Sequence, residues 1–139
     1  MGALCMNLKQ VCETLLDNAD MRIDLSAFPK VTLDILVYGT MDDKYWKAVF
    51  ECGQVVYMEA ELDDDSSSND LFVVLETRVK ETTKSKVTPS VQHRMNDLQD
   101  EDPVWEVHLY GGMSLTLITT KFDWKLVELA ESEYEMACA

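Results

Sequence analysis

The sequence predicts an α+β domain dominated by antiparallel β-strands, and two observations support this fold class. Several stretches alternate apolar and polar residues, most clearly residues 104–129, and such alternation is typical of half-buried strands. One stretch near the N-terminus has helical spacing instead. We therefore expect an antiparallel meander of about six or seven strands, built as a sheet, a sandwich or a half-open barrel, with an N-terminal amphipathic helix.

The helix is expected to begin at Asn7 and to end near Asn18. Asn7 can cap the first turn, and Gln10 stands three residues later, in the capping-box position. Apolar residues then follow at helical spacing: Leu8, Val11, Cys12 and Leu15. Such a helix would cover one face of the sheet or plug the open end of a half-closed barrel.

Four stretches before residue 81 are candidate strands. Residues 31–37, 55–62 and 71–80 alternate, whereas 44–52 fit both a helix face and a strand face. Aromatic and β-branched residues favour a strand for 44–52. The expected inward sets are Val31, Leu33, Ile35 and Val37; Trp46, Ala48 and Phe50; Val56, Met58, Ala60 and Leu62; and Leu71, Val73, Leu75, Thr77 and Val79. Residues 19–30 show no clean period, and Pro29 indicates a connection or an irregular edge.

Residues 104–117 are expected to form a hairpin with a three-residue loop, Tyr110-Gly111-Gly112. This loop places only apolar pairs on the buried face: Leu109 with Met113, Val107 with Leu115, and Trp105 with Leu117. Its last position needs a positive φ, which Gly112 would supply. Apolar residues then move to even positions, so we expect a bulge or break within 118–121.

Length bounds the organisation of the chain. At 139 residues, the chain is expected to be one domain, 1–139. Residues 81–102 show only a weak helical pattern, with Ser90 as a candidate cap. Long loops without secondary structure are uncommon unless they are mobile or functional. We therefore predict that 81–102 is a long mobile loop.

Charge is the most unusual property of the composition. The chain has 26 acidic residues and 12 basic residues, a net charge of −14. Such a surface repels nucleic acid and anionic membranes and attracts a basic protein partner. Negative charge also keeps proteins soluble, so solubility alone is the alternative explanation.

Two groups of acids stand out from this background. One group lies at a strand–loop–strand corner, and the other precedes the strand of Trp105. If the strands around them are neighbours, the two groups would form one negative patch, with Tyr57 as an aromatic anchor. The predicted partner-binding residues are Tyr57, Glu59, Glu61, Asp63, Asp64, Asp65, Asp70, Asp100, Glu101 and Asp102.

Catalysis, metal binding and cofactor binding are not predicted. A calcium loop starting at Asp63 would need glycine and glutamate where Ser68 and Val74 stand. His93 and His108 belong to no catalytic motif, and the four cysteines lack metal-site spacing. No phosphate-binding glycine loop is present. Without a secretory signal or a membrane-spanning stretch, we expect reduced thiols and a cytoplasmic location.

Three function classes remain, in this order of preference. The first is a non-enzymatic acidic binding module, in its most concrete form an inhibitor or immunity-type protein that occludes the basic site of a toxin or nucleic-acid enzyme. The alternative is a small-ligand-binding barrel or accessory subunit with a cavity lined by Trp46, Trp105 and Trp124. The third is a hydrolase that uses His108 with Cys52 or Ser114. The sequence leaves the oligomeric state open.

Overall fold

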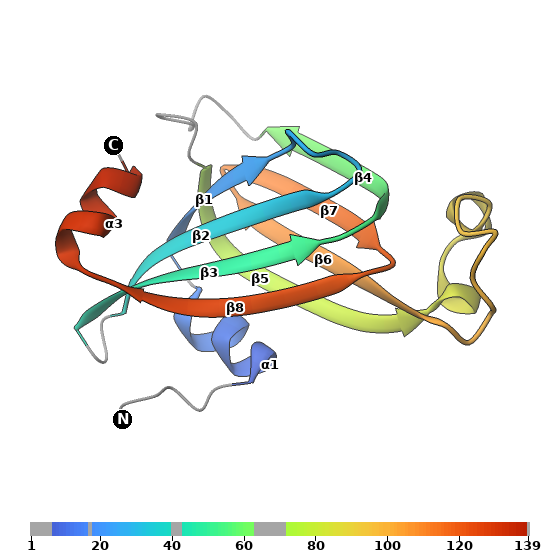
Figure 1. Ribbon diagram of the computed structural model, residues 1–139, viewed down its shortest axis with the longest axis horizontal. Coiled ribbons are helices and arrows are strands. Elements are labelled where there is room, and N and C mark those ends of the chain that lie inside the picture. Colours follow the sequence, from blue (N-terminus) through green and yellow to red (C-terminus); the bar gives the residue numbers. More distant parts are fainter. Residues whose placement is uncertain (1–6, 17, 40–42, 63–71, 139) are drawn as a thin grey trace.

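The structure is a computed structural model that describes residues 7–16, 18–39, 43–62 and 72–138, without the side chains of Thr14 and Leu15. The described residues form one antiparallel sheet of eight strands in the order β4-β7-β6-β5-β1-β2-β3-β8 (Figure 1). The strands are β1 (Ala19–Asp24), β2 (Val31–Gly39), β3 (Lys44–Cys52), β4 (Val55–Leu62), β5 (Phe72–Thr83), β6 (Pro103–Gly111), β7 (Met113–Thr119) and β8 (Phe122–Leu129). The α+β class and the antiparallel sheet are confirmed, and the number of strands is larger than predicted.

The sheet closes on itself at a corner where β3 leads into β4 and β7 leads into β8. The Gly53 N–H donates to the Lys121 carbonyl at 2.7 Å, and the Thr120 N–H donates to the Gln54 carbonyl at 3.0 Å. These bonds continue the β3–β8 ladder into the β4–β7 ladder. Among the described strands, only β4 and β8 keep an unpaired edge.

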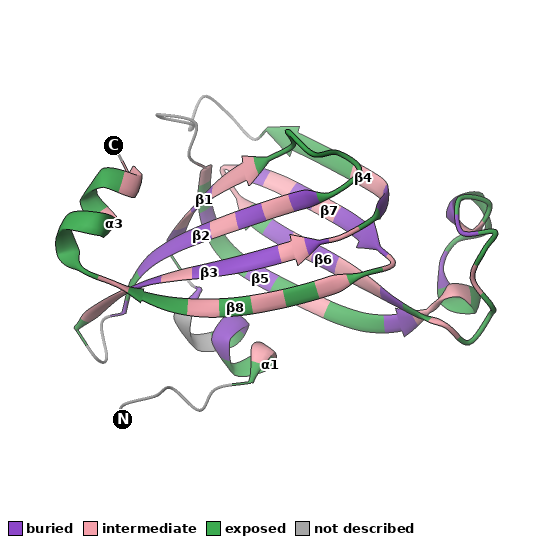
Figure 2. Ribbon diagram, viewed as in Figure 1, coloured by how far each residue is buried: buried purple, intermediate pink, exposed green. Residues whose placement is uncertain are grey.

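The inner face of this curved sheet holds the main hydrophobic core. In Figure 2 the buried positions alternate with more exposed ones along β2 and β3. The predicted inward sets of β2 and β3 are confirmed: Val31, Leu33, Ile35, Val37, Trp46, Ala48 and Phe50 are all buried. β7 ends at Thr119 and β8 begins at Phe122, as the predicted break requires. Beyond that break, Phe122, Trp124 and Leu126 pack against the same core.

The N-terminal segment has the predicted cap but not the predicted helix. The Asn7 side chain accepts from the Gln10 N–H at 2.8 Å, and the Gln10 side chain accepts from the Asn7 N–H at 3.0 Å. The α-helical part, α1, spans only Leu8–Gln10, and a π-helical segment, η1, follows at Val11–Leu15. A π turn holds an extra residue, and Val11 and Leu16 both lie in the main core. The Leu15 side chain lies outside the described residues.

In the β6–β7 hairpin the predicted side chains face inward, but the residues pair in a different register. Leu109 pairs with Leu115, not with Met113. The two registers differ by two residues, so the same side chains reach the inner face in both. The positive φ predicted for Gly112 is also wrong, because no glycine in the described residues has one.

The tip of this hairpin is held by β5 instead of by a tight turn. Gly111 pairs with Val74, and the Gly112 N–H donates to the Val73 carbonyl at 2.9 Å. A Cβ at position 111 would lie 2.0 Å from that carbonyl oxygen. Only glycine fits this close approach between two backbones.

β5 contains a bulge that changes which residues face the core. Its register shifts between Val74 and Glu76, and Leu75 is 55% exposed. Val74 is buried before the bulge and Thr77 after it. The predicted inward set is therefore wrong at Val73 and Leu75, because a bulge reverses the alternation.

β1 occupies the middle of the sheet, between β5 and β2. The interpretation of residues 19–30 as a connection is correct only for the turn that follows Asp24. Ala19 and Met21 are buried, while Asp20 and Arg22 alternate with them at intermediate exposure. This six-residue alternation is the strand that the sequence analysis missed.

The side chains of β4 face the predicted way, but most of the predicted inward set is not buried. Met58, Ala60 and Leu62 lie opposite inward-facing residues of β7. Only Met58 packs against the core, and Leu62 is 61% exposed. A register shift between Val55 and Tyr57 turns Val56 towards a different cluster.

Residues 81–102 contain the end of β5, a 3-10 turn η2 (Lys84–Lys86) and a short helix α2 (Pro89–Gln92). Val87, Val91 and Met95 form a second core with Val56, Val104 and Ile118. This small lobe lies at one end of the sheet (Figure 1). Its mobility stays a prediction.

The C-terminal helix α3 (Glu131–Cys138) lies at the opposite end, against β2, β3 and β8. The ring of Tyr134 lies 4.5 Å from that of Tyr45. The Arg22 guanidinium donates to the Ala137 carbonyl at 3.0 Å. The helix therefore covers part of the outer face of the sheet.

Candidate functional site

The outer face of β4, β7 and β6 brings several of the predicted binding residues together. Glu59 lies opposite Thr116, and Thr116 lies opposite His108. Glu61 lies opposite Ser114 in the same way. We call this surface the acidic face, and it consists of Tyr57, Glu59, Glu61, Glu106, His108, Tyr110, Ser114 and Thr116.

The acidic face has carboxylates but no strand-borne cation. β4, β6 and β7 contain Glu59, Glu61 and Glu106, and they contain no lysine or arginine. Glu59 and Glu61 are exposed and form no ion pair within the described part of the chain. Like charges held close together raise the free energy of the unbound surface.

Among the described residues, cations lie at the borders of this face, where Arg94 of the small lobe also reaches the Val56 carbonyl. Arg78 and Lys80 of the neighbouring strand β5 lie opposite His108 and Glu106. Arg78 is already paired with Glu76. The charge on β4, at the far side of the face, has no such neighbour among the paired strands.

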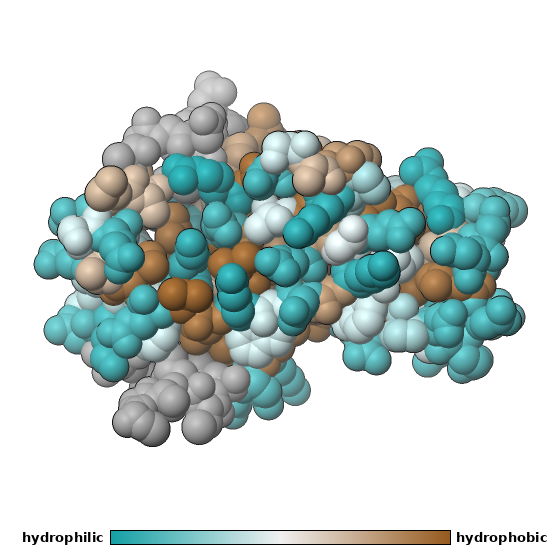
Figure 3. Space-filling view, viewed as in Figure 1, coloured by the Kyte–Doolittle hydropathy of each residue, from teal (hydrophilic) through white to brown (hydrophobic). Residues whose placement is uncertain are grey.

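The outer face of β1, β2, β3 and β8 is different, because charges of both signs alternate there. Arg22 lies opposite Asp34, and Lys47 and Lys125 stand on the same strands as acids. Figure 3 views the molecule from this side and shows a mostly hydrophilic surface with small, separate apolar spots. Charges of both signs are therefore mixed on this face, so it would not select a partner by the sign of its charge.

Tyr57 links the acidic face to the small lobe. Its hydroxyl donates to a Glu59 carboxylate oxygen at 3.2 Å. This hydrogen bond and the negative charge of Glu59 raise the pKa of Tyr57. One part of the ring packs against the second core. A partly buried tyrosine with a polar tip is typical of interface anchors.

His108 lies at the centre of the face between two partners. One ring nitrogen is 3.2 Å from the Thr116 hydroxyl, and the other is 3.3 Å from a Glu106 carboxylate oxygen. Of its two sequence-based partners, Cys52 is buried in the core, where burial raises its pKa to about 12. Ser114 shares the acidic face with His108, but the hydroxyl that contacts the ring is that of Thr116. A hydroxyl, an imidazole and a carboxylate thus stand in a row. Acyl transfer also needs free donors for an oxyanion, and strand pairing on both sides of β6 occupies its backbone donors.

The second acidic group lies elsewhere. Asp102 immediately precedes β6, whereas Glu61 lies opposite Ser114 near the hairpin tip. The nine residues of β6 separate the two places by about 26 Å at the usual rise per residue. Asp102 also has a structural role, because its carboxylate accepts from the Gln99 N–H at 2.9 Å.

The described members of the two acidic groups, Glu59 and Glu61 on one side and Asp100, Glu101 and Asp102 on the other, therefore lie apart. Asp100, Glu101 and Asp102 lie in the small lobe, where Lys84, Lys86 and Arg94 provide opposite charge. Tyr57, Glu59 and Glu61 lie on the acidic face. Asp63, Asp64, Asp65 and Asp70 lie outside the described residues. Alternation along residues 104–110 implies that Glu106, His108 and Tyr110 share one strand face, but no local pattern places that strand near β4.

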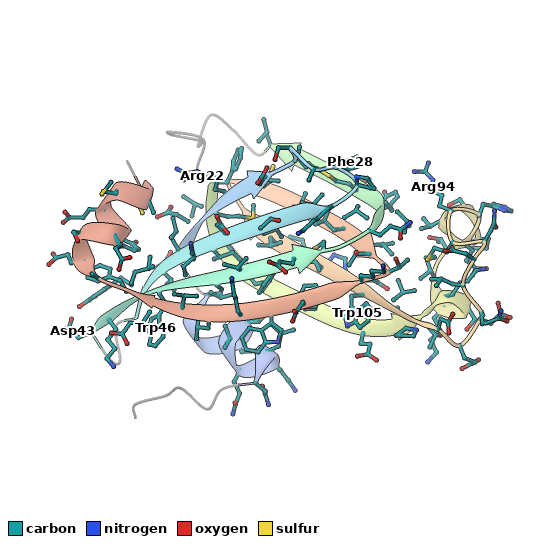
Figure 4. The ribbon with its side chains drawn as sticks, in the orientation of Figure 1. Arg22, Phe28, Asp43, Trp46, Arg94 and Trp105 are labelled. Atoms are coloured by element: carbon teal, nitrogen blue, oxygen red, sulfur yellow. The ribbon has the colours of Figure 1, made fainter. Side chains whose placement is uncertain are left out.

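The three tryptophans of the alternative hypothesis are spread along the inner face. Trp46 and Trp105 lie near opposite ends of the sheet (Figure 4). Trp124 lies opposite Phe50, four residues along β3 from Trp46, or about 13 Å. Trp105 stacks on Phe122 at 6.4 Å. The three indoles therefore do not surround one point.

No group of three His, Cys, Asp or Glu side chains suited to a metal ion occurs within the described ranges. The described cysteines, Cys12, Cys52 and Cys138, are free thiols. No helix of the described chain has the length and apolar character needed to cross a membrane. Comparison of the chain with protein-family models, curated proteins and solved structures found no match.

Proposed function

We propose that the chain is a non-enzymatic protein-binding module that recognises a basic protein partner through the acidic face. The observation that carries this proposal is a run of three neighbouring strands with three carboxylates and no lysine or arginine. In its most concrete form, the chain is an inhibitor or immunity-type protein that occludes the basic site of a toxin or nucleic-acid enzyme. We propose a cytoplasmic site of action and no direct contact with nucleic acid or membrane.

Electrostatics and aromatic side chains support this proposal. Carboxylates at the positions of Glu59 and Glu61 would take the place of phosphates in a cleft that normally binds nucleic acid. The net charge of −14 would steer a basic partner during encounter and raise the association rate. Tyr57 and Tyr110 would add apolar area on the same face.

One observation favours the second candidate, a small-ligand-binding barrel. Thr77 is 3% exposed, and its hydroxyl has no hydrogen-bond partner in the described structure. A buried polar atom without a partner is costly, and a polar group of an internal ligand would satisfy it. Salt separates the two candidates, because only the electrostatic partner should bind more weakly as ionic strength rises.

Reversing the two exposed charges of β4 tests the first candidate. The double variant Glu59→Lys/Glu61→Lys is expected to slow association with a basic partner by about tenfold or more at low salt, because the steering field is removed. Partners would be found by pull-down of basic nucleases and of proteins encoded beside this chain. On-rates would then be measured at two salt concentrations.

A matched control is available in the small lobe. Asp100→Lys/Glu101→Lys makes the same change in charge on exposed residues, which lie in the small lobe before the start of β6 and not on the strands of the acidic face. This variant should keep most of the on-rate and most of its salt dependence. If both variants slow association equally, the on-rate depends on the net charge of the chain and not on the acidic face in particular. Slowing by the control alone would move the site to the small lobe.

A further inference from the structure

We propose that the free edge of β4 accepts an extended segment of the basic partner as an added β-strand. This inference rests on the proposed function and specifies how the partner docks. β4 pairs only with β7 within the described residues. Its beginning is occupied, because the Val55 N–H donates to the Pro29 carbonyl at 2.9 Å and Arg94 donates to the Val56 carbonyl at 3.4 Å. Along the edge opposite β7, the backbone from Tyr57 to Leu62 has no hydrogen-bond partner among the described segments.

Within the described residues, this stretch of β4 is protected against strand pairing by two acidic side chains, Glu59 and Glu61, which repel an acidic strand but not a basic one. Natural edges are blunted by charged side chains, lysine above all, by proline, by a bulge or by a covering segment. The stretch from Tyr57 to Leu62 contains no lysine and no proline, and the register shift of β4 lies before it. Residues 59–62 are all exposed.

The other free edge, on β8, is protected in comparison. Lys125 stands in the middle of β8. The inward side chains Phe122, Trp124 and Leu126 pack against the main core, to which Leu8 of the N-terminal segment also belongs. An added strand would therefore find apolar contacts free at β4 and already used at β8.

The side chains of β4 define the chemistry of the incoming strand. Ala60 and Leu62 face inward yet stay exposed, so neighbouring guest side chains on that side would be apolar. Glu59 and Glu61 point outward, so guest side chains beside them would be lysine or arginine. Cross-strand neighbours of opposite charge stabilise a sheet, and alternate pockets give specificity in strand addition. The guest is thus an extended segment that alternates basic and apolar residues.

A second copy of the chain is a poor occupant of the same edge. Antiparallel pairing of two β4 strands around Ala60 would set Glu59 of one copy opposite Glu61 of the other. Like charges directly opposite one another destabilise a sheet. Each copy would also bring a net charge of −14. The charge of the edge favours a basic partner.

The test uses two peptide probes with the full chain. The first is a ten-residue peptide of alternating lysine and valine, and the second has the same sequence with every backbone amide methylated. Both have the same charge and side chains, but only the first can complete a strand ladder. The first peptide is expected to bind about tenfold more tightly or better, because strand addition gains affinity from main-chain hydrogen bonds. It should also slow hydrogen exchange at residues 57–62.

Two variants with the same added charge sharpen the test. Ala60→Lys puts an inward-side lysine on the edge, a natural protection against strand pairing, and it should bring the two peptides to equal affinity. Leu75→Lys adds the same charge at the exposed bulge of β5, and it should keep the difference between the peptides. Both positions are exposed, so thermal unfolding should change little.

The outcomes separate the docking mode from the proposed function. Equal binding of both peptides, abolished by Glu59→Lys/Glu61→Lys, would overturn strand addition and leave the acidic face as the binding surface. Binding that ignores Glu59 and Glu61 would overturn both proposals. Failure of the first peptide to slow exchange at 57–62 would also overturn strand addition. A dimer in sedimentation that Ala60→Lys dissociates would assign the edge to a second copy and overturn the inference.

Discussion

Replacing Gly111 with alanine is expected to destabilise the chain by about 3–5 kcal/mol, since overpacking alone costs about 1–3 kcal/mol and a lost hydrogen bond adds to it. The new Cβ would lie 2.0 Å from the Val73 carbonyl oxygen. The two backbones must separate, which breaks the bond from the Gly112 N–H to the same oxygen. Urea unfolding followed by tryptophan fluorescence measures the change.

Gly53→Ala gives a graded comparison at the corner of the sheet. Its Cβ would lie 2.9 Å from the Lys121 Cβ, a much milder clash. We expect a loss of about 1–2 kcal/mol, at the lower end of overpacking costs. If Gly111→Ala is no worse than Gly53→Ala, the hairpin tip does not lie against β5 as described.

Thr119→Val is expected to destabilise the chain by about 1–3 kcal/mol, because it removes the side-chain partner of part-buried backbone groups of Gln54 and Lys121. Thr119 is fully buried, and its hydroxyl lies 2.9 Å from the carbonyl oxygens of both Gln54 and Lys121. It also accepts from the N–H groups of the same two residues, at 3.3 Å and 3.4 Å. One hydroxyl therefore ties the two connections together where the sheet closes. Differential scanning calorimetry measures the loss.

Thr119→Ser is the matched control for this position. It keeps the hydroxyl and deletes one methyl group, so the expected loss is about 1 kcal/mol. Valine has nearly the shape of threonine, and a serine variant less stable than the valine variant would mean that packing, not hydrogen bonding, holds the corner.

Local patterns were sufficient to predict part of the fold. The cap at Asn7 depends on two residues that are close in sequence, and the structure has it. The buried faces of β2 and β3 follow from plain alternation. The break before Phe122 follows from a change of parity. Each of these features is encoded within a few consecutive residues.

Features that depend on distant pairing were not predictable in the same way. A two-residue register shift in the β6–β7 hairpin leaves its faces unchanged, so alternation cannot detect it. The bulge at Leu75 becomes visible only when Gly111 pairs with Val74. β1 was missed because only Ala19, Met21 and Ile23 mark its apolar side.

The candidate site shows the same limit. The alternation of each strand implies that Glu59 and Glu61 point outward on β4 and that Glu106 and His108 share a face of β6. The pairing of β7 with both strands brings them together, and no local pattern specifies it. The same pairing separates Glu61 from Asp102, which were expected to share one patch if the strands around them were neighbours.

The most direct test of the acidic face is a chemical-shift titration of the isotope-labelled chain with a lysine decamer. We expect the largest changes at Glu59, Glu61, Glu106 and His108, and we expect them to disappear as salt screens the charges. Largest changes at residues 97–102 or in α3, with none in β4, β6 or β7, would contradict the proposal that the acidic face binds a basic partner.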